Sequence, residues 1–376
     1  MTDIIFSDRV IAFLDALSSA LMKNKEVRQY PDVITFAFFC RKANILSLSK
    51  RYDQNKIRLG RGTIFHIAPS NVPVNFAYSL LAGLLAGNSN IVRVSSKRFR
   101  QVELIEDAIE GLQTEFTDIV ERIKLVRYER GGVETGLYSS QADVRIIWGG
   151  DNTIEEIRKS PLPPRSFDIT FADRYSLAVI NADVFPDNSI EINKLVEGFY
   201  NDTYLFDQNA CTAPHLVVWL GDKKKISTSK TVFWDALYQY EKTKYEFQPI
   251  MAVDKLTAFY RQAIEGNIET EQTYDNSLWR VDVKELTEDI EKFRCTGGYF
   301  SEYIAESLDD IVSVINDKYQ TLAYYGLNAE ELKDFVVKNR VNGVDRIVPV
   351  GRTLDFDLVW DGYDLIEKLS REITIQ

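Results

Sequence analysis

Residues 62–99 read GTIFHIAPSNVPVNFAYSLLAGLLAGNSNIVRVSSKRF, and they contain two strand signals with a helix signal between them. The β-branched and apolar run at 62–68 predicts a short strand, and the following PSNVP at 69–73 is typical of a turn. The apolar run at 74–87 has the length of a helix. After it, IVRVS at 91–95 predicts a second, buried strand.

The same alternation continues downstream. Ser96 is expected to open a helix at 96–113 that carries charges on one face. Further strand and helix signals alternate at 123–128, 132–140, 143–148 and 152–160. Strands that alternate with helices at this spacing are typical of a parallel sheet covered on both faces. We therefore predict an α/β fold whose first domain, at about 1–195, is a doubly wound dinucleotide-binding domain.

The second half of the chain predicts a separate α/β domain. A long helix signal is followed by a turn, a buried strand at 215–221 and another helix signal at 230–243. The chain has 376 residues, which is too long for one ordinary hydrophobic core and suits two domains. We place this second domain at 196–354, and the segment at about 355–376 could return to the first domain.

Composition excludes several classes of protein. The net charge is −11 and the sequence pI is about 5.0, so the chain as a whole repels a nucleic-acid backbone. Residues 1–23 break their apolar positions with charges, which predicts an amphipathic helix and differs from a signal peptide. No stretch approaches the roughly 20 apolar residues that a membrane span needs. We expect a cytoplasmic protein with no nucleic-acid partner.

The cysteines and histidines are few. Cys40, Cys211 and Cys295 are widely separated and have no CxxC spacing, which argues against a disulfide framework and a zinc site. His66 and His215 are the only histidines, so a Ser-His-Asp triad and a multi-histidine metal centre are nearly excluded. We expect no metal, and catalysis that uses other groups.

Cys211 lies in the most informative surroundings. The turn-like residues 207–210 precede it and Thr-Ala-Pro follows, so it is expected in a loop between a helix and a strand. Cys40, in FAFFC, predicts a small buried hydrophobic residue, and Cys295 has no partner signal. Most cysteines are structural, and the residues alone leave that alternative open for Cys211.

Four motifs together resemble the LuxC-type acyl-CoA (fatty-acid) reductases of the aldehyde dehydrogenase superfamily. They are PSNVP at 69–73, GLLAGNSNIVRVSSK at 83–97, DQNAC at 207–211 and GVDRIVPVGRTLDFDLVWDG at 343–362. The resemblance implies an aldehyde-dehydrogenase-like fold with a dinucleotide-binding and a catalytic domain. It also implies an enzyme that reduces an acyl thioester, carried by CoA or by an acyl carrier, to an aldehyde with NAD(P)H.

By the same resemblance, Cys211 is the nucleophile and Asn71 belongs to an oxyanion hole. Attack by a thiolate exchanges one thioester for another, a step that needs no strong general acid. The amide of Asn71 would stabilise the charge that builds on the carbonyl oxygen. The alternative for Asn71 is that it caps the helix that follows, a position that asparagine favours.

The resemblance places a cofactor at loops that follow strands. In a doubly wound sheet, ligands bind at the carboxyl ends of the strands, where Pro69 and Ser70 are expected. Gly149 and Gly150 separate a strand from a helix and resemble the superfamily's turn near the pyrophosphate. A Gly-Gly turn is also common as a purely structural feature.

Arg93 ends the second strand, where the family places a basic residue near the adenosine ribose. NAD-preferring relatives often have an acidic residue three positions on, but this chain has Ser96, followed by Lys97 and Arg98. A hydroxyl and nearby cations accept a 2′-phosphate, whereas a carboxylate repels it. We therefore expect NADPH, with NADH as a possibility. The alternative is a helix start with ordinary surface charges.

One departure from the superfamily bears on the reaction. Oxidising aldehyde dehydrogenases supply a glutamate base in the segment that corresponds to 167–180, and no glutamate occurs there. Asp173 is the only acid that follows the strand. Without such a base, hydrolysis of an acyl-enzyme is slow, which favours the reductase direction. Near the other end, Arg346, Trp360 and Asp361 stand out only by resemblance, and we expect structural roles for them.

Two alternatives remain open from the sequence. The same cysteine mechanism could reduce an acyl phosphate, and the fold could serve as a non-catalytic scaffold. An acyl-activating ligase is a possible partner of the thioester reductase. By analogy with the superfamily, we expect a homo-oligomer, either a dimer or a tetramer.

Overall fold

The computed structural model describes residues 2–53, 55–69, 71–129, 131–265 and 268–375 and divides the chain into two compact units. The first unit consists of Met1–Asp173 together with Phe356–Gln376, and the second consists of Arg174–Asp355. The division falls after Asp173, upstream of residue 195, which is the boundary that the sequence analysis predicts. The reason is that the strand β7 (Tyr175–Asn181) pairs with two strands of the second unit.

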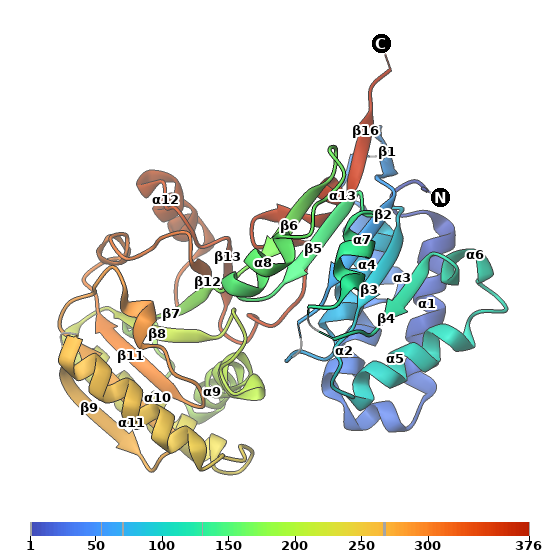
Figure 1. The fold of residues 1–376 in the computed structure, drawn as a ribbon. Coiled ribbons are helices and arrows are strands. Elements are labelled where there is room, and N and C mark those ends of the chain that lie inside the picture. Colours follow the sequence, from blue (N-terminus) through green and yellow to red (C-terminus); the bar gives the residue numbers. More distant parts are fainter. Residues whose placement is uncertain (1, 54, 70, 130, 266–267, 376) are drawn as a thin grey trace. The chain divides into compact units, whose positions relative to one another are not determined.

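Within the described residues, the first unit is built on a five-stranded parallel sheet of order β4-β3-β2-β5-β6 (Figure 1). Its strands are β2 (Thr63–Ile67), β3 (Ser89–Arg93), β4 (Ile123–Val126), β5 (Val144–Trp148) and β6 (Phe167–Phe171). The chain moves outward from β2 to β4 and then returns to β5. This is the order of a doubly wound sheet, so the predicted α/β fold is confirmed. Ligands of such sheets bind where the winding direction changes, here between β2 and β5.

Helices cover both faces of this sheet. Successive side chains of a strand point to opposite faces, and Ile64 packs in a core with residues of α1, α2, α4 and α5. Phe65 and Ile67 pack in a second core with residues of α7 and α8. The helices are α1 (Asp8–Lys23), η1 (Glu26–Gln29), α2 (Pro31–Phe39), α3 (Lys42–Ser49), α4 (Asn75–Leu85), α5 (Arg100–Gly111), α6 (Thr117–Val120), α7 (Val133–Ser139), α8 (Asp151–Arg158) and α13 (Leu365–Leu369).

Helix α4 is apolar on nearly all sides because strands and other helices surround it. It contacts β2 and β3 on one side, and α1 and α13 on others. From Phe76 to Leu85, every residue except Tyr78 is buried. Removing each of its leucines from water contributes roughly 1.5–3 kcal/mol to folding. The continuous apolar run in the sequence therefore marks a central helix of the unit.

The C-terminal segment completes the first unit. Strand β16 (Ser370–Ile373) pairs antiparallel with β1 (Ile57–Gly60), and β14 (Val359–Trp360) pairs with β15 (Tyr363–Asp364). Leu365, Ile366 and Leu369 of α13 are buried in the same core as α4. Residues far apart in the sequence thus lie side by side at the edge where β2 begins.

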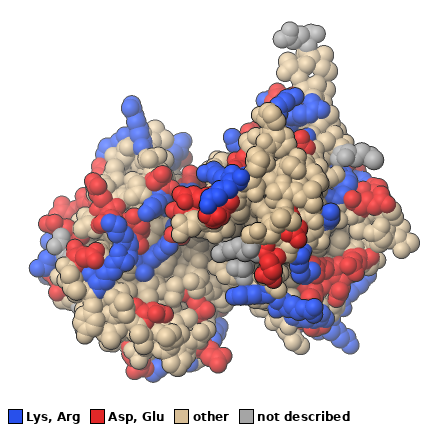
Figure 2. Space-filling view, in the orientation of Figure 1, with Lys and Arg blue, Asp and Glu red and all other residues tan. Residues whose placement is uncertain are grey.

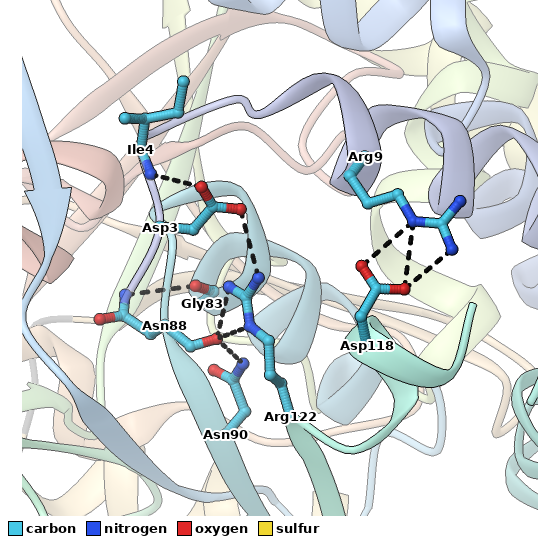
Figure 3. A network of polar contacts seen from close by, with 8 residues as sticks. All are labelled: Asp3, Ile4, Arg9, Gly83, Asn88, Asn90, Asp118 and Arg122. Atoms are coloured by element: carbon cyan, nitrogen blue, oxygen red, sulfur yellow. Dashed lines mark hydrogen bonds and ion pairs between the residues drawn. The ribbon is translucent and has the colours of Figure 1, made fainter. Parts of the chain in front are cut away.

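The Ala-Gly-Asn turn of the family motif fixes this junction. Asn88 donates from its side chain to the carbonyl oxygens of Gly83 (3.2 Å) and Leu369 (2.9 Å), and accepts from the N–H of Gly62 (3.0 Å). Its own carbonyl oxygen accepts from the guanidinium of Arg122 (Figure 3). Gly87 has a φ of +85°, and a Cβ there would lie 2.1 Å from the carbonyl oxygen of Asp3. The motif is therefore a structural turn at the amino edge of the sheet.

One predicted helix start is wrong. Helix α5 begins at Arg100 with Phe99 as its N-cap, and Ser96 does not open it. Instead, the hydroxyl of Ser95 accepts the N–H of Lys97 (3.1 Å), which favours a local turn over a helix. Ser96 and Lys97 consequently lie in the loop that follows β3.

The second unit, in the part that the structure describes, contains a seven-stranded sheet of order β13-β12-β7-β8-β11-β10-β9 (Figure 1). All neighbouring strands are parallel except β9 and β10. Besides β7, the strands are β8 (Pro214–Leu220), β9 (Ile268–Tyr274), β10 (Leu278–Val283), β11 (Tyr299–Ile304), β12 (Tyr319–Tyr325) and β13 (Arg346–Pro349). The central strand β8 is buried along its whole length, as its continuous apolar sequence predicts.

Helices also cover both faces of the second sheet. One core joins the sheet to α9 and α10, and the other joins it to α12 and the short helices η4 and η5. The helices of this unit are η2 (Ala182–Val184), α9 (Ser189–Thr203), η3 (Tyr204–Phe206), α10 (Lys223–Glu241), α11 (Ile250–Glu265), η4 (Ile290–Phe293), η5 (Leu308–Ile311) and α12 (Ala329–Asn339). The unit is thus a second, independent α/β layer structure.

The surface is charged and mixed. On the face drawn in Figure 2, Lys and Arg side chains are interspersed with Asp and Glu side chains. None of the helices in the described ranges combines the length and the apolar character that crossing a membrane requires.

Candidate active site

The residues predicted to bind a cofactor lie at one edge of the first sheet. Because β2, β3 and β5 are parallel, their carboxyl ends meet at the same edge. Pro69 and Asn71 follow β2, Ser96 and Lys97 follow β3, and the Gly149–Gly150 pair follows β5. Ser70 lies outside the described residues.

Asn71 does not cap the helix that follows it. Helix α4 has Val74 as its N-cap and no side-chain cap hydrogen bond. The side chain of Asn71 is exposed and makes no hydrogen bond within the described part of the chain. The capping alternative is therefore wrong, and the amide of Asn71 stays available to a ligand.

Arg93, at the end of β3, is held from one side. Its guanidinium carbon lies 4.9 Å from the centre of the Tyr128 ring, and its Nη2 donates to the Tyr128 carbonyl oxygen (3.3 Å). Its Nε is buried and has no hydrogen-bond partner among the described residues. Ser96 and Lys97, in the adjoining loop, are exposed. Arg93 therefore keeps one donor that the described residues do not satisfy.

The two glycines after β5 have different surroundings. Gly149 donates its N–H to Phe171 (3.1 Å), and a Cβ on Gly149 would press against Thr153 at 3.2 Å. Gly150 is the N-cap of α8, and a Cβ there would meet nothing within 4 Å. Gly149 is thus tightly packed against the Thr153 side chain, whereas Gly150 exposes backbone at a helix N-terminus, where anions bind. The carboxylate of Asp151 in the first turn opposes part of that attraction.

The acids at the end of the first unit have separate surroundings. Asp168 is occupied by an ion pair with the buried Arg145, which donates from Nε at 2.7 Å. Asp173 is exposed, and its N–H donates to the carboxylate of Asp151 (3.4 Å). Asp168 is therefore structural, and Asp173 has no geometry that marks it as a base.

Cys211 lies in a short loop that enters the central strand of the second unit. Helix α9 and η3 end before it, and β8 begins three residues after it. The turn uses two left-handed residues, Asp207 with a φ of 51° and Gln208 with a φ of 61°. The Cys211 side chain is partly exposed, as a nucleophile in a loop must be.

Gln208 anchors this loop. Its side chain is 1% exposed and makes four hydrogen bonds. Its amide nitrogen donates to the carbonyl oxygens of Pro214 (2.9 Å) and Tyr299 (3.1 Å), and its oxygen accepts the N–H groups of Gly298 (3.0 Å) and Tyr299 (3.1 Å). A single buried amide therefore ties the cysteine loop to β8 and β11.

Two side chains from neighbouring strands contact Cys211 itself. Gln320 of β12 donates from Nε2 to the sulfur (3.4 Å), and Ser176 of β7 donates to the carbonyl oxygen of Cys211 (2.7 Å). The sequence analysis missed both residues, as well as Gln208. Gln320 is 109 residues from the cysteine, and no local pattern marks it.

The other cysteines are less suited to nucleophilic chemistry. Cys40 is 0% exposed, and burial raises the pKa of its thiol well above the usual value. Burial also raises the pKa of Cys295. Since the thiolate is the nucleophile, both shifts oppose reactivity at neutral pH.

Both histidines are buried. Burial lowers the pKa of His66 to about 4, and its ring lies between Ser79 (2.8 Å) and Asn90 (3.0 Å). Burial and the nearby Arg294 lower the pKa of His215 to about 3. Both rings are therefore neutral at physiological pH and have no route to protonate a substrate. Among the described residues, no group of three or more His, Cys, Asp or Glu side chains could hold a metal ion.

The last family motif has a packing role. Gly351 approaches Gly198 of α9 so closely that a Cβ on Gly351 would lie 2.9 Å from the Gly198 Cα. The carboxylate of Asp202 accepts the N–H groups of Gly351 (2.6 Å) and Thr353 (3.0 Å). Arg346 donates to the carbonyl oxygens of residues 353 and 355. These contacts fix the last turn of the second unit.

Solved structures with a similar fold include aldehyde dehydrogenases. The glyceraldehyde-3-phosphate dehydrogenase GapN from Methanocaldococcus jannaschii, solved in complex with NADP, matches 98% of this chain and 88% of its own length, with a TM-score of 0.67 and 13% identity. Aldehyde dehydrogenase 21 from Physcomitrella patens matches 97% of this chain and 85% of its own length, with a TM-score of 0.65 and 10% identity. The chain therefore has the aldehyde dehydrogenase fold, as the sequence predicts.

The sequence comparisons specify the family. The family model described as acyl-CoA reductase (LuxC) matches residues 17–372. A long-chain acyl-protein thioester reductase from Photobacterium leiognathi is 26% identical over 185 residues, which are 48% of this chain and 35% of that relative. A relative of the same description from Vibrio harveyi is 26% identical over 183 residues, 48% of this chain and 36% of its own length. The match thus spans only about a third of these curated relatives. The chain belongs to the LuxC acyl-CoA reductase family.

Proposed function

We propose that this protein reduces an acyl thioester to an aldehyde with NADPH, through an acyl intermediate on Cys211. The observation that carries the proposal is the partly exposed thiol in a loop anchored by the buried Gln208. The family description and the names of the thioester reductase relatives support the acyl substrate.

The carboxyl edge of the first sheet suits a dinucleotide. The buried, unsatisfied Nε of Arg93 and the open backbone at Gly150 are the features that fit such a group. We assign Gly150 and Pro69 to contacts near the phosphates and Arg93, Ser96 and Lys97 to the adenosine end. Exposed Ser96 and Lys97 favour a 2′-phosphate, hence NADPH rather than NADH. The NADP complex of the archaeal GapN structure supports a nicotinamide dinucleotide in this fold. When bound, the reduced nicotinamide supplies a hydride.

The chemistry of the second unit begins with acyl transfer. The thiolate of Cys211 attacks the thioester carbonyl carbon, a new C–S bond forms, and the bond to the donor thiol breaks and releases that thiol as a thiolate. The acyl group on Cys211 would accept the hydride that the reduced nicotinamide supplies and would become a thiohemiacetal anion. Its collapse breaks the C–S bond, releases the aldehyde and returns the cysteine thiolate. Asn71 is assigned to stabilise the oxyanion of these steps.

Hydrolysis of the acyl-enzyme is expected to be slow. No glutamate occurs at 167–180, Asp168 is paired with Arg145, and both histidines are neutral and buried. The acyl group on Cys211 therefore reacts with hydride or with another thiol faster than with water.

The acyl donor and the assembly are part of the proposal. CoA and a carrier protein offer the same thioester, and the relatives named acyl-protein thioester reductases favour a protein-bound acyl group, supplied by an acyl-activating ligase. A homo-oligomer is expected by analogy with the superfamily.

The test is a comparison of substrates and cysteine variants. NADPH oxidation and aldehyde formation are measured with a long-chain acyl-CoA and with an acyl phosphate. We expect reduction of the thioester, no activity in Cys211→Ala, and near-normal activity in the control Cys295→Ala. Reduction of the acyl phosphate alone would assign the other substrate class, and full activity in Cys211→Ala would overturn the mechanism. The absence of both acyl capture on Cys211 and reduction of either substrate would favour a non-catalytic scaffold.

A further inference from the structure

The strand β7 is flanked near Cys211 by two irregularities. Its pairing with β12 shifts register between Tyr319 and Leu322, and its pairing with β8 shifts between Ser176 and Leu177. Extra residues in one strand of a pair bend the strand and re-aim its side chains, and such bulges occur next to active sites. Both shifts occur at the end of β7 that adjoins the cysteine loop.

The hydroxyl of Ser176 occupies this disrupted region. It accepts the N–H of Thr321 (3.2 Å) and donates to the carbonyl oxygen of Cys211 (2.7 Å). One buried hydroxyl thus links β12, β7 and the backbone of the cysteine. This makes Ser176 a positioning residue for the loop.

The same bulge directs Gln320 to the sulfur. Gln320 is 0% exposed, and its Nε2 donates to the Cys211 sulfur at 3.4 Å. Its Oε1 accepts the hydroxyl of Thr321 (3.4 Å), so the amide oxygen has a partner while the nitrogen faces the sulfur. A buried amide held in one orientation is a preorganised donor.

We propose that Gln320 stabilises the thiolate of Cys211 and holds the sulfur in its attacking position. This inference rests on the proposed function, because it assigns a role to Gln320 in forming the acyl-enzyme. An N–H donor strengthens its hydrogen bond when the sulfur becomes an anion, so it favours the reactive form. Neither histidine is available to do so, and the chain uses a neutral amide in place of a base.

The test measures the thiolate directly, without any acyl substrate. The full-length protein is treated with iodoacetamide at a series of pH values, and carbamidomethylation of the Cys211 peptide is followed by mass spectrometry. Gln320→Met keeps the length of the side chain and removes the donor. We expect alkylation of Cys211 to slow about tenfold at neutral pH, with the rate profile displaced to higher pH.

Gln262→Met is the matched control. Gln262 is also a buried glutamine of the second unit, and it bonds to the hydroxyl groups of Tyr299 (2.6 Å) and Ser301 (3.1 Å). Its replacement removes comparable hydrogen bonds but leaves the donor to the sulfur in place, so the alkylation profile should not move. Melting temperatures of both variants show whether general loosening explains a change.

Gln320→Glu provides a second variant of nearly the same shape. Its carboxylate repels a thiolate, so alkylation should slow at least as much as in Gln320→Met. An alkylation profile unchanged from the wild type in a folded Gln320 variant would overturn the inference. If the profile moves but the wild type captures no acyl group, the role of Gln320 stands and the proposed function fails.

Discussion

The loop that carries Cys211 and the loop that carries Asn71 are built in opposite ways. Around Cys211, buried side chains of Gln208, Gln320 and Ser176 bond to the loop from three directions. Asn71 is exposed and makes no hydrogen bond within the described residues. The difference indicates that the fold prearranges the proposed nucleophile, whereas it leaves the proposed oxyanion donor exposed to a ligand.

The largest expected effect tests the anchoring of the loop that carries Cys211. Gln208→Leu leaves two N–H and two C=O groups buried without their partner, and each costs roughly 1–3 kcal/mol. We expect the free energy of unfolding to fall by about 4 kcal/mol or more. Chemical denaturation measures it. A loss below about 1 kcal/mol would mean that the loop has other anchors.

The role of the exposed Asn71 side chain is tested by Asn71→Ala. Removal of an oxyanion donor lowers the turnover rate by about 10²–10³. Because the side chain caps no helix, the unfolding free energy should stay within about 0.5 kcal/mol of the wild type. Turnover and denaturation are measured on the same preparation. A stability loss with normal turnover would reverse the assignment.

Asn88 lies at the amino edge of the first sheet, opposite the carboxyl edge where Asn71 lies, and it has a structural role instead of a proposed catalytic one. Asn88→Ala removes three hydrogen bonds that join α4, residue 62 and α13. We expect the unfolding free energy to fall by about 2–3 kcal/mol, while the kinetic constants of the surviving folded protein change little. A selective loss of turnover at full stability would contradict the structural role.

The smallest effect concerns cofactor choice. Lys97→Glu replaces an exposed cation by an anion in the loop after β3. If this loop meets a 2′-phosphate, the ratio of kcat/KM for NADPH to that for NADH should fall about tenfold, or 1.4 kcal/mol. Steady-state kinetics with both cofactors measures this ratio. The same substitution at Lys284, an exposed lysine of the second unit, should leave it unchanged.

Local patterns in the sequence were sufficient to predict most strands and helices, but not which strands pair with one another. The β-branched runs at β2, β3, β5 and β8 predicted strands because burial on both faces demands such residues. The boundary between the two units was placed too late because the strands that pair with β7 come later in the chain. Ser96 was wrongly expected to begin a helix because the hydroxyl of Ser95 accepts the N–H of Lys97 and forms a turn there.

The candidate site divides in the same way. Cys211 could be proposed because its turn residues and its family motif are adjacent in sequence. Gln320 and Ser176 could not, because strand pairing and two bulges bring them to the cysteine. Contacts of that kind depend on tertiary structure, and propensity and spacing do not contain them.

Peptide mapping of the acyl-enzyme tests the central claim most directly. The protein is mixed with a labelled acyl-CoA in the absence of nicotinamide cofactor, digested and analysed by mass spectrometry. The label is predicted on the peptide that contains Cys211, as a hydroxylamine-sensitive thioester that is lost in Cys211→Ala and kept in Cys295→Ala. A label on Cys40 or Cys295 instead, or reduction that proceeds while Cys211 stays unmodified, would contradict the account.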